Sequence, residues 1–355
     1  MKKAISLLLV FVLVLSLCAC LKKPLTGEDV YNLIAPSTVE ITAMGRGFES
    51  TGTGFFIDGS GTLVTNYHVI EDCTEAKITI FDGGTYDVLS VVGYSVELDI
   101  AILSTSHKNS KTVSFRSSEV HTGETVYALG SSLGLTGTFS EGVISTAERE
   151  LDGNKYIQTT APISSGNSGG PLVDSEGNVI GITSAGFTDG QNLNLAIPIS
   201  AIESIRVGEP MTLKDVRKAE SKGVLVVAVE PSFYPYSEER NGEYFGLHVD
   251  MAEEIAARNG YVAEFVSADW DELFIGIKDG SYNLVLGIEP TPERQEAYAN
   301  TSVNFTDVYF DGMAAMYNVK NLELSFGEWT KFKFTIQDML EDGTIAAMLR
   351  YYNLI

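Results

Sequence analysis

One short run of the chain has the composition expected around a nucleophilic serine. Residues 166–171 read Gly-Asn-Ser-Gly-Gly-Pro, so that Ser168 stands among glycines. Glycines let the backbone turn sharply and approach a substrate carbonyl without a Cβ clash. A serine hydroxyl is a weak nucleophile by itself and needs a neighbouring base, together with N–H donors for the oxyanion formed on attack. The same run is also an acceptable loop, so other residues must decide between the two interpretations.

His68 is the upstream candidate for the base. Residues 54–57 (Gly-Phe-Phe-Ile), a glycine-rich turn and residues 62–64 (Thr-Leu-Val) predict a β-hairpin whose second strand ends near His68. A lone histidine beside apolar residues is more often a core residue than a base, and this alternative stays open. The chain has three further histidines, which we expect in polar or turn-like surroundings: His107, His121 and His248.

Asp99 is the candidate for an acid that orients the histidine. It directly precedes residues 100–103 (Ile-Ala-Ile-Leu), an apolar run that predicts a strand. Burying an unpaired carboxylate at such a place would be costly. Asp99 is therefore either an ordinary strand-start residue or the acceptor for the His68 Nδ1–H. The second role holds the tautomer that leaves Nε2 free to take the serine proton.

The order His68, Asp99, Ser168 resembles that of the chymotrypsin-like serine peptidases, and most of all the HtrA/Deg branch. The resemblance covers roughly residues 27–206 and rests on stretches 52–56, 65–69, 99–103, 128–130, 141–145, 157–159, 166–171 and 195–198. It implies an all-β fold of two antiparallel six-stranded barrels with the three residues at their junction. Many short β-branched runs separated by Gly, Asn and Asp turns support this expectation independently.

The resemblance also implies a role for each residue in hydrolysing a polypeptide substrate. Ser168 would attack the scissile carbonyl, His68 would serve as general base and then as general acid, and Asp99 would orient His68. The backbone N–H groups of Gly166 and Ser168 would form the oxyanion hole. We expect neither a metal ion nor a cofactor.

Two further expectations concern specificity and assembly. In the two-barrel fold, the walls of the specificity pocket correspond to residues 161–164 and 182–186, and neither segment contains an acidic residue. A basic side chain at the cleavage site would lack a counter-charge, so small or medium apolar side chains are expected there. HtrA-type peptidases are commonly trimers, and the resemblance alone suggests a homotrimer here.

The first residues predict export. Two lysines follow Met1, and residues 4–19 form an apolar run of about 16 residues, shorter than the roughly 20 that span a membrane. A spanning anchor is therefore the weaker alternative to a signal peptide over residues 1–19. Residues 17–20 (Leu-Cys-Ala-Cys) resemble a bacterial lipobox, which implies a lipid on Cys20, a short linker over residues 20–26, and anchoring to the outer face of the bacterial cell membrane.

Charge and cysteine content exclude some classes of protein. The 355-residue chain has a net charge of −23, shared by both halves. Such acidity argues against nucleic-acid binding and against electrostatic attachment to anionic lipid. Beyond the lipidated Cys20 only Cys73 would remain, so the mature chain has no internal disulfide. The length suggests two domains, a peptidase over 27–206 and a second domain over 223–355, joined by a linker helix over 207–222.

The second domain has an α/β pattern. Residues 224–229 (Val-Leu-Val-Val-Ala-Val) form the continuous apolar run of a strand buried on both faces. Residues 250–259 have helical spacing and end at Gly260, a natural C-cap. A strand over 261–266, a helix over 270–278 and a strand over 284–286 follow, which predicts alternating strands and helices in one layered domain.

Residues 224–309 resemble one lobe of the family 3 extracellular solute-binding proteins, a type 2 periplasmic-binding-protein fold. The matching stretches are 231–236, 246–251, 270–273 and 291–294. The resemblance implies an amino-acid or peptide ligand, with its carboxylate held by Arg294 and its sides walled by Phe233 and Tyr236. Glu289 departs from the family, which places a small hydroxyl there, and a carboxylate would repel an anion or neutralise Arg294. We expect the usual second lobe to be missing.

Two classes of function remain. The first is a lipid-anchored serine endopeptidase that acts on exported or misfolded proteins. The second is a binding or sensory lipoprotein whose peptidase fold is a scaffold and whose second domain binds a small ligand or a partner. The three spaced motifs favour the first class.

Overall fold

The computed structural model describes residues 25–45, 48–108, 110–132, 135–151, 153–164, 166–184, 194–322 and 324–355. The expected signal peptide 1–19, the lipid acceptor Cys20 and the start of the 20–26 linker lie outside the described residues. The chain divides into two compact units between Lys214 and Asp215, inside the segment 207–222 that we expected to link two domains. Within the described parts of the chain, no helix is both long and apolar enough to cross a membrane.

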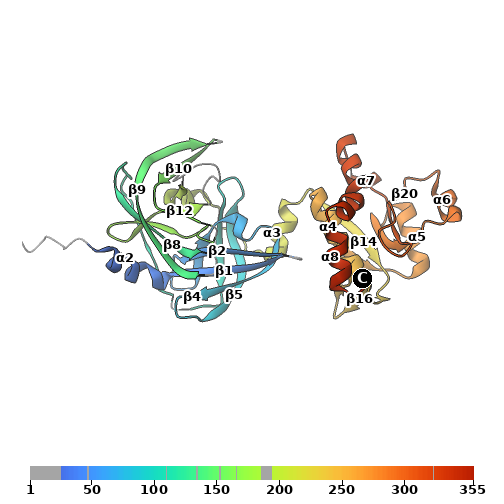
Figure 1. The fold of residues 1–355 in the computed structure, drawn as a ribbon, viewed down its shortest axis with the longest axis horizontal. Coiled ribbons are helices and arrows are strands. Elements are labelled where there is room, and N and C mark those ends of the chain that lie inside the picture. The colour runs from blue at the N-terminus through green and yellow to red at the C-terminus, as the bar shows by residue number, and fades with distance from the viewer. Residues whose placement is uncertain are drawn as a thin grey trace, which may run out of the picture. The chain divides into compact units, whose positions relative to one another are not determined.

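The first unit begins with a short helical segment and a closed barrel (Figure 1). The elements are α2 Gly27–Ile34, η1 Ala35–Ser37, β1 Thr38–Gly45, β2 Glu49–Phe56, β3 Thr62–Thr65, η2 Tyr67–Val69, β4 Cys73–Ile80, β5 Thr85–Ser95 and β6 Ile100–Thr105. The strand order around the barrel is β1-β2-β3-β6-β5-β4. The expected hairpin is β2–β3, in which Phe55 pairs with Val64, and η2 follows it directly.

A second barrel completes this unit. Its elements are β7 Ser114–Phe115, β8 Thr125–Ser132, β9 Leu135–Leu151, β10 Asn154–Thr159, β11 Pro171–Asp174, β12 Asn178–Ser184, β13 Asn194–Pro198 and η3 Ile199–Ser204. The sheet runs β11-β8-β9-β10-β13-β12, the pairing of β11 with β12 closes it, and β7 adds a short parallel strand to β12. The prediction of two six-stranded antiparallel barrels is confirmed.

The two barrels share an apolar core. One buried cluster contains Phe55 and Ile100 from the first barrel and Leu129 and Ile182 from the second. Burying each such side chain stabilises the fold by roughly 1.5–3 kcal/mol. The junction of the barrels is therefore part of the core, and groups placed there are held firmly.

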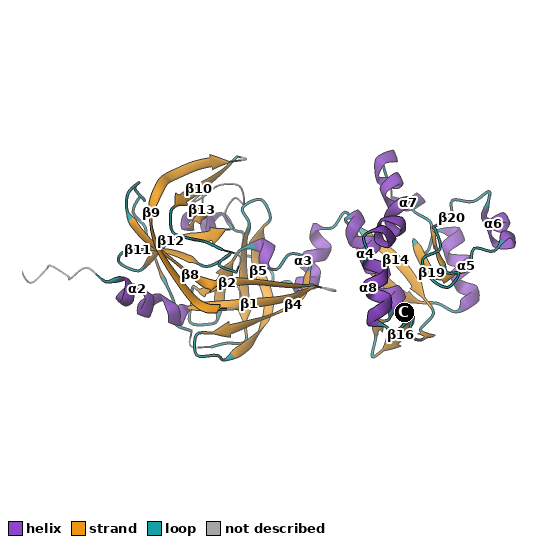
Figure 2. Cartoon of the chain, in the orientation of Figure 1, coloured by secondary structure: helices purple, strands orange, loops and turns teal. Residues whose placement is uncertain are grey.

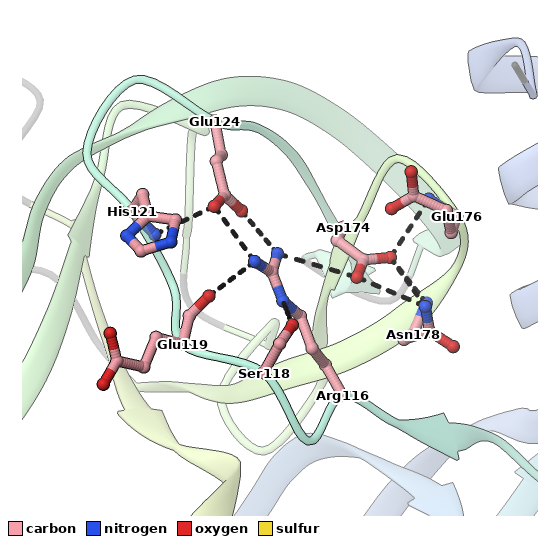
Figure 3. A network of polar contacts seen from close by, with 8 residues as sticks. All are labelled: Arg116, Ser118, Glu119, His121, Glu124, Asp174, Glu176 and Asn178. Carbon is pink, nitrogen blue, oxygen red and sulfur yellow. Dashed lines mark hydrogen bonds and ion pairs between the residues drawn. The ribbon is translucent and has the colours of Figure 1, made fainter.

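A polar network braces the second barrel at its surface (Figure 3). The Arg116 guanidinium forms a two-point ion pair with the Glu124 carboxylate, donates to the Glu119 carbonyl oxygen at 2.6 Å and lies 3.8 Å from the Asp174 carboxylate. Bidentate pairing of this kind fixes geometry as well as charge. Arg116 thus connects the segment before β8 to the end of β11.

The second unit is an α/β domain, in agreement with the sequence pattern (Figure 2). Its elements are α3 Leu213–Glu220, which spans the division, β14 Val224–Val229, β15 Ser232–Phe233, β16 Ser237–Arg240, β17 Glu243–Phe245, α4 Leu247–Asn259, β18 Val262–Ser267, α5 Trp270–Asp279, β19 Leu284–Ile288, α6 Pro292–Tyr298, β20 Asn304–Phe305, β21 Ala314–Tyr317, η4 Lys320–Leu322, α7 Phe326–Glu341 and α8 Thr344–Tyr351. The main sheet runs β18-β14-β19-β21-β20, with β14 parallel to both neighbours.

Helices cover both faces of this sheet. Val227 of β14 belongs to a buried cluster with residues of α4, α7 and α8, whereas its neighbour Ala228 belongs to a cluster with residues of α5. The alternation explains the continuous apolar run of β14, because each face of the strand meets a helical layer. The predicted C-cap is also present, since Gly260 adopts the left-handed conformation with φ 81°.

The expectation for His248 was wrong. His248 lies at the start of α4 and is 3 % exposed. Its Nε2 is hydrogen-bonded to the Tyr309 hydroxyl at 2.8 Å, and that hydroxyl accepts from the Gly287 N–H. Burial lowers the pKa of His248 to about 3. The sequence around His248 did not reveal this burial, because the partners of the ring lie in β19 and at Tyr309, far along the chain.

The neutral, buried His248 predicts that the second unit loses stability as the pH falls below 6.5, its ordinary pKa, toward about 3. The folded ring binds a proton less tightly than the unfolded chain does, so protonation favours unfolding, by up to about 1.4 kcal/mol per pH unit. Denaturant unfolding between about pH 7.5 and about pH 5 measures this. The two tryptophans of the chain, Trp270 and Trp329, both belong to this unit and supply the fluorescence signal.

A His248→Gln variant should lose most of that pH dependence. His121→Gln is the matched control, because His121 is exposed and belongs to the other unit. A His248→Gln protein with the pH dependence of the parent would contradict the assignment.

Candidate active site

The first barrel places His68 and Asp99 against each other. His68 lies in η2, just after β3, and Asp99 directly precedes β6, which pairs with β3. The His68 Nδ1 lies 2.8 Å from Asp99 Oδ2, and the His68 backbone N–H donates to Asp99 Oδ1 at 2.9 Å. Adjacent strands thus bring together two residues that are 31 positions apart. The bond on Nδ1 leaves Nε2 as the ring nitrogen available to a substrate or a nucleophile.

The backbone around Asp99 is held in an uncommon conformation. Asp99 has φ 52°, in the left-handed region that Asp tolerates better than most residues. The Asn66 side-chain amide donates to the Asp99 carbonyl oxygen at 2.8 Å, and the Ser184 hydroxyl donates to Asp99 Oδ2 at 3.5 Å. Asn66 is fully buried. These contacts aim the Asp99 carboxylate at the imidazole.

The surroundings of His68 favour its protonated form. Partial burial of the ring acts to lower its pKa, but the hydrogen bond and the negative charge of Asp99, with a smaller effect from Glu71, outweigh burial and raise the pKa above 6.5. A base with a raised pKa accepts a proton more readily, and its imidazolium is stabilised once formed. The His68–Asp99 pair can therefore act as a general base.

Ser168 lies in the turn between β10 and β11. Two glycines shape this turn, because Gly166 has φ 95° and Gly169 has φ 85°. A Cβ on Gly169 would lie 2.3 Å from the Thr53 carbonyl oxygen, so no larger residue fits there. The Gly169 N–H donates to the Thr183 carbonyl oxygen at 2.8 Å. Glycines at these two places are a steric requirement of the turn.

The Ser168 turn is bonded to the barrel that contains His68. The Thr53 N–H, in β2, donates to the Ser168 carbonyl oxygen at 2.8 Å. The β2 strand pairs with β3, which leads to His68. Among the described residues no hydrogen bond joins the Ser168 hydroxyl to the His68 ring; such bonds are often long in substrate-free enzymes and tighten when substrate binds.

Sequence reasoning missed several residues that build this site. Thr53 bonds to Ser168, and Asn66 and Ser184 bond to Asp99, yet none of the three received an individual role from the sequence. Thr53 and Asn66 do stand within the stretches that carry the peptidase resemblance. Their position in those stretches was the only available signal, because their partners are distant in sequence.

In the second unit, the four predicted ligand residues form two separate pairs. Phe233 stacks on Tyr236 with ring centroids 4.8 Å apart, and Tyr236 lies 5.0 Å from the ring of His248. Among the described residues no hydrogen bond, ion pair or ring contact joins this pair to Glu289 or Arg294. The two rings therefore pack as part of an aromatic cluster around His248.

Arg294 is engaged by its own domain. Its Nη1 donates to the Glu289 backbone carbonyl oxygen at 2.8 Å, and its guanidinium lies over the rings of Phe274 and Trp270, at 5.3 and 5.8 Å. The contact with Glu289 is thus made by the main chain, and no ion pair joins the two side chains among the described residues. That the Glu289 carboxylate neutralises Arg294 toward an anionic ligand therefore stays a prediction.

We expect the pKa of His68 to fall when Asp99 is replaced by Asn. The substitution removes the charge that favours the protonated ring, while the burial that disfavours it remains. Proton NMR resolves this, because the chain has only four histidines and His68→Gln identifies the signal. Glu71→Gln is the control and should lower the pKa less. An Asp99→Asn protein whose His68 titrates as in the parent would contradict the pairing.

Comparisons with known proteins agree with both resemblances. Residues 52–182 match the family model of the trypsin-like peptidase domain, and residues 225–354 match that of the bacterial extracellular solute-binding proteins, family 3. The putative serine protease HhoB of Synechocystis sp. is 30% identical over 250 residues, covering 68% of this chain and 55% of that protein. Protease Do-like 1, chloroplastic, of Arabidopsis thaliana is 35% identical over 170 residues, covering 44% and 38%.

Among solved structures, the HtrA-type protease AlgW with a tripeptide is 30% identical, with a TM-score of 0.48 over 51% of this chain and 62% of that one. The chain spans little more than half of the first curated relative and less of the second. It therefore contains a trypsin-like peptidase domain similar to that of HtrA-type proteases, followed by a domain similar to the family 3 solute-binding proteins.

Proposed function

We propose that the chain is a serine endopeptidase with Ser168 as nucleophile, His68 as general base and Asp99 as orienting acid. The observation that supports this most strongly is the His68–Asp99 pair, with Nδ1 and Oδ2 2.8 Å apart, in the barrel to which the Ser168 turn is bonded. A histidine tautomer fixed in this way, beside a glycine-shaped serine turn, is the arrangement that acyl transfer needs.

The proposed reaction has two halves. As Ser168 Oγ attacks the scissile carbonyl carbon, its proton moves to His68 Nε2, and the carbonyl oxygen becomes an oxyanion that accepts from the N–H groups of Gly166 and Ser168. The imidazolium, stabilised by Asp99, then gives the proton to the leaving amine, and an acyl-enzyme ester remains. Water repeats the sequence, with His68 as base, and releases the acid and the free serine.

The pH dependence follows from the base. His68 must be neutral to take the serine proton, and Asp99 raises its pKa. Activity should therefore decline as the pH falls through this raised pKa, and the acid limb should lie above the ordinary histidine value of 6.5.

The proposed substrates are exported or misfolded polypeptides cleaved after small or medium apolar residues. The walls of the specificity pocket would be residues 161–164 and 182–184, together with residues 185 and 186, which lie outside the described part of the chain. None of these residues is acidic. A lysine or arginine at the cleavage site would be desolvated without a counter-charge, which costs free energy.

Replacement of Ser168 by Ala should reduce casein cleavage by roughly 10⁴-fold, because no other group can form the acyl-enzyme. Ser145→Ala is a matched control, since its buried hydroxyl, in β9, has no hydrogen-bond partner among the residues that the structure describes. The control should cleave like the parent. The proposal fails if Ser168→Ala retains the activity of the parent.

We further propose that the protein is exported and anchored to the outer face of the bacterial cell membrane through a lipid on Cys20. The support is the lipobox-like sequence at residues 17–20 after an apolar run. One lipid chain gives only weak, reversible membrane binding, so stable attachment needs the multiple acyl chains of a bacterial lipoprotein.

Cys20→Ser should abolish lipid labelling and release the protein from the membrane fraction of a bacterial host. Labelling with a clickable fatty acid, followed by fractionation, measures both effects. Cys18→Ser is the control and should behave like the parent, because Leu17 before it is a poor lipobox residue. Unchanged labelling in Cys20→Ser would place the lipid elsewhere.

A further inference from the structure

The oxyanion hole consists of backbone N–H groups, so its function depends on how peptide planes are held. In a trans peptide, the carbonyl oxygen and the N–H of one unit point in opposite directions. The Asn167 carbonyl and the Ser168 N–H belong to one such unit. Whatever fixes the Asn167 oxygen on the inner side of the turn therefore directs the Ser168 N–H to the outer side.

A buried threonine of the second barrel fixes the Asn167 carbonyl. The Thr183 hydroxyl, in β12, donates to the Asn167 oxygen at 2.5 Å, and the Gly170 N–H donates to the same oxygen at 2.9 Å. Thr183 is fully buried, so water does not compete for its hydroxyl. The peptide unit that includes the Ser168 N–H is thus held by two donors.

A second buried threonine, from the first barrel, fixes the preceding carbonyl. The Thr53 hydroxyl donates to the Gly166 oxygen at 2.6 Å and accepts from the Ser131 N–H at 3.0 Å. Its hydrogen is therefore committed to Gly166 and its oxygen to Ser131. Thr53 is fully buried as well, and its own N–H donates to the Ser168 oxygen. Thr53 therefore bonds to the turn on both sides of Asn167.

We propose that Thr53 and Thr183 are positioning residues for catalysis: their hydroxyls, one from each barrel, hold the two peptide units that follow Gly166, so that the Ser168 N–H of the oxyanion hole faces the substrate. The inference rests on the proposed peptidase function. It adds that groups from both barrels hold the oxyanion hole, so that the packing between the barrels determines the geometry of the hole. We call these two threonine hydroxyls the clamp. The clamp also maintains the left-handed φ of 95° at Gly166.

Thr53→Val and Thr183→Val test this, because valine keeps the branched shape and removes only the hydroxyl. In each variant kcat should fall about ten- to a hundredfold with KM little changed, since the lost orientation matters in the transition state. Affinity for a peptide boronate, which forms a tetrahedral adduct on serine, should fall by a similar factor. Thr53→Ser and Thr183→Ser restore the hydroxyl and should recover most of kcat.

Thr105→Val is the matched control for a merely structural role. Thr105 is also fully buried in the first barrel, and its hydroxyl donates to the Gly61 carbonyl oxygen at 2.8 Å. Loss of one buried hydrogen bond should lower its stability about as much as in the other valine variants, while kcat and boronate affinity stay at the parent values.

Hydrogen exchange over residues 164–171 tests the clamp without any catalytic readout. Exchange should be faster by about tenfold or more in Thr53→Val and Thr183→Val, and unchanged in Thr105→Val. Parent-like kcat, boronate affinity and exchange in both clamp variants would overturn the inference and leave the peptidase function intact. A parent that cleaves nothing would overturn the function, and the exchange result would still decide whether the clamp exists.

Discussion

The site depends on how the two barrels pack against each other. The proposed base and its orienting acid come from the first barrel, whereas the proposed nucleophile comes from a turn of the second, so a small slip between the barrels would separate them. The apolar cluster shared by both barrels resists such a slip without specifying direction. Direction comes from the hydrogen bonds of Thr53 to the Gly166 and Ser168 carbonyls. Apolar packing therefore keeps the two barrels together, and a few buried polar contacts fix their relative position.

Around Asp99, strand pairing and a buried polar contact likewise make separate contributions. The pairing of β3 with β6 brings the acid near His68, as the order of the strands requires. The rarer left-handed backbone at Asp99 is then secured by the Asn66 amide, which is buried and bonded to the Asp99 carbonyl oxygen. Residues held in sparsely populated conformations tend to cluster at functional sites, where the surrounding structure over-determines them.

The prediction of two barrels came from the family resemblance, with the pattern of short strands in support. Local signals in the sequence were enough for the hairpin before His68, the strand after Asp99 and the glycine turn at Ser168. Each of these is encoded within a few residues by periodicity or by turn chemistry. The bond from Thr53 to Gly166 spans 113 positions, and the burial of His248 depends on Tyr309, 61 positions away. Neither of these interactions is indicated by the residues adjacent to it in the sequence. The predicted grouping of Phe233 and Tyr236 with Arg294 came from family resemblance alone, and among the described residues no hydrogen bond, ion pair or ring contact joins them.

The proposed chemistry requires Ser168 to be an activated nucleophile. The most direct measurement is to treat the intact protein with a fluorophosphonate and identify the modified residue by peptide mass spectrometry, which requires no knowledge of the natural substrate. We expect one adduct, on Ser168, that forms faster as the pH rises through the pKa of His68. No adduct on the folded protein, or an adduct on another residue with Ser168 unmodified, would contradict it.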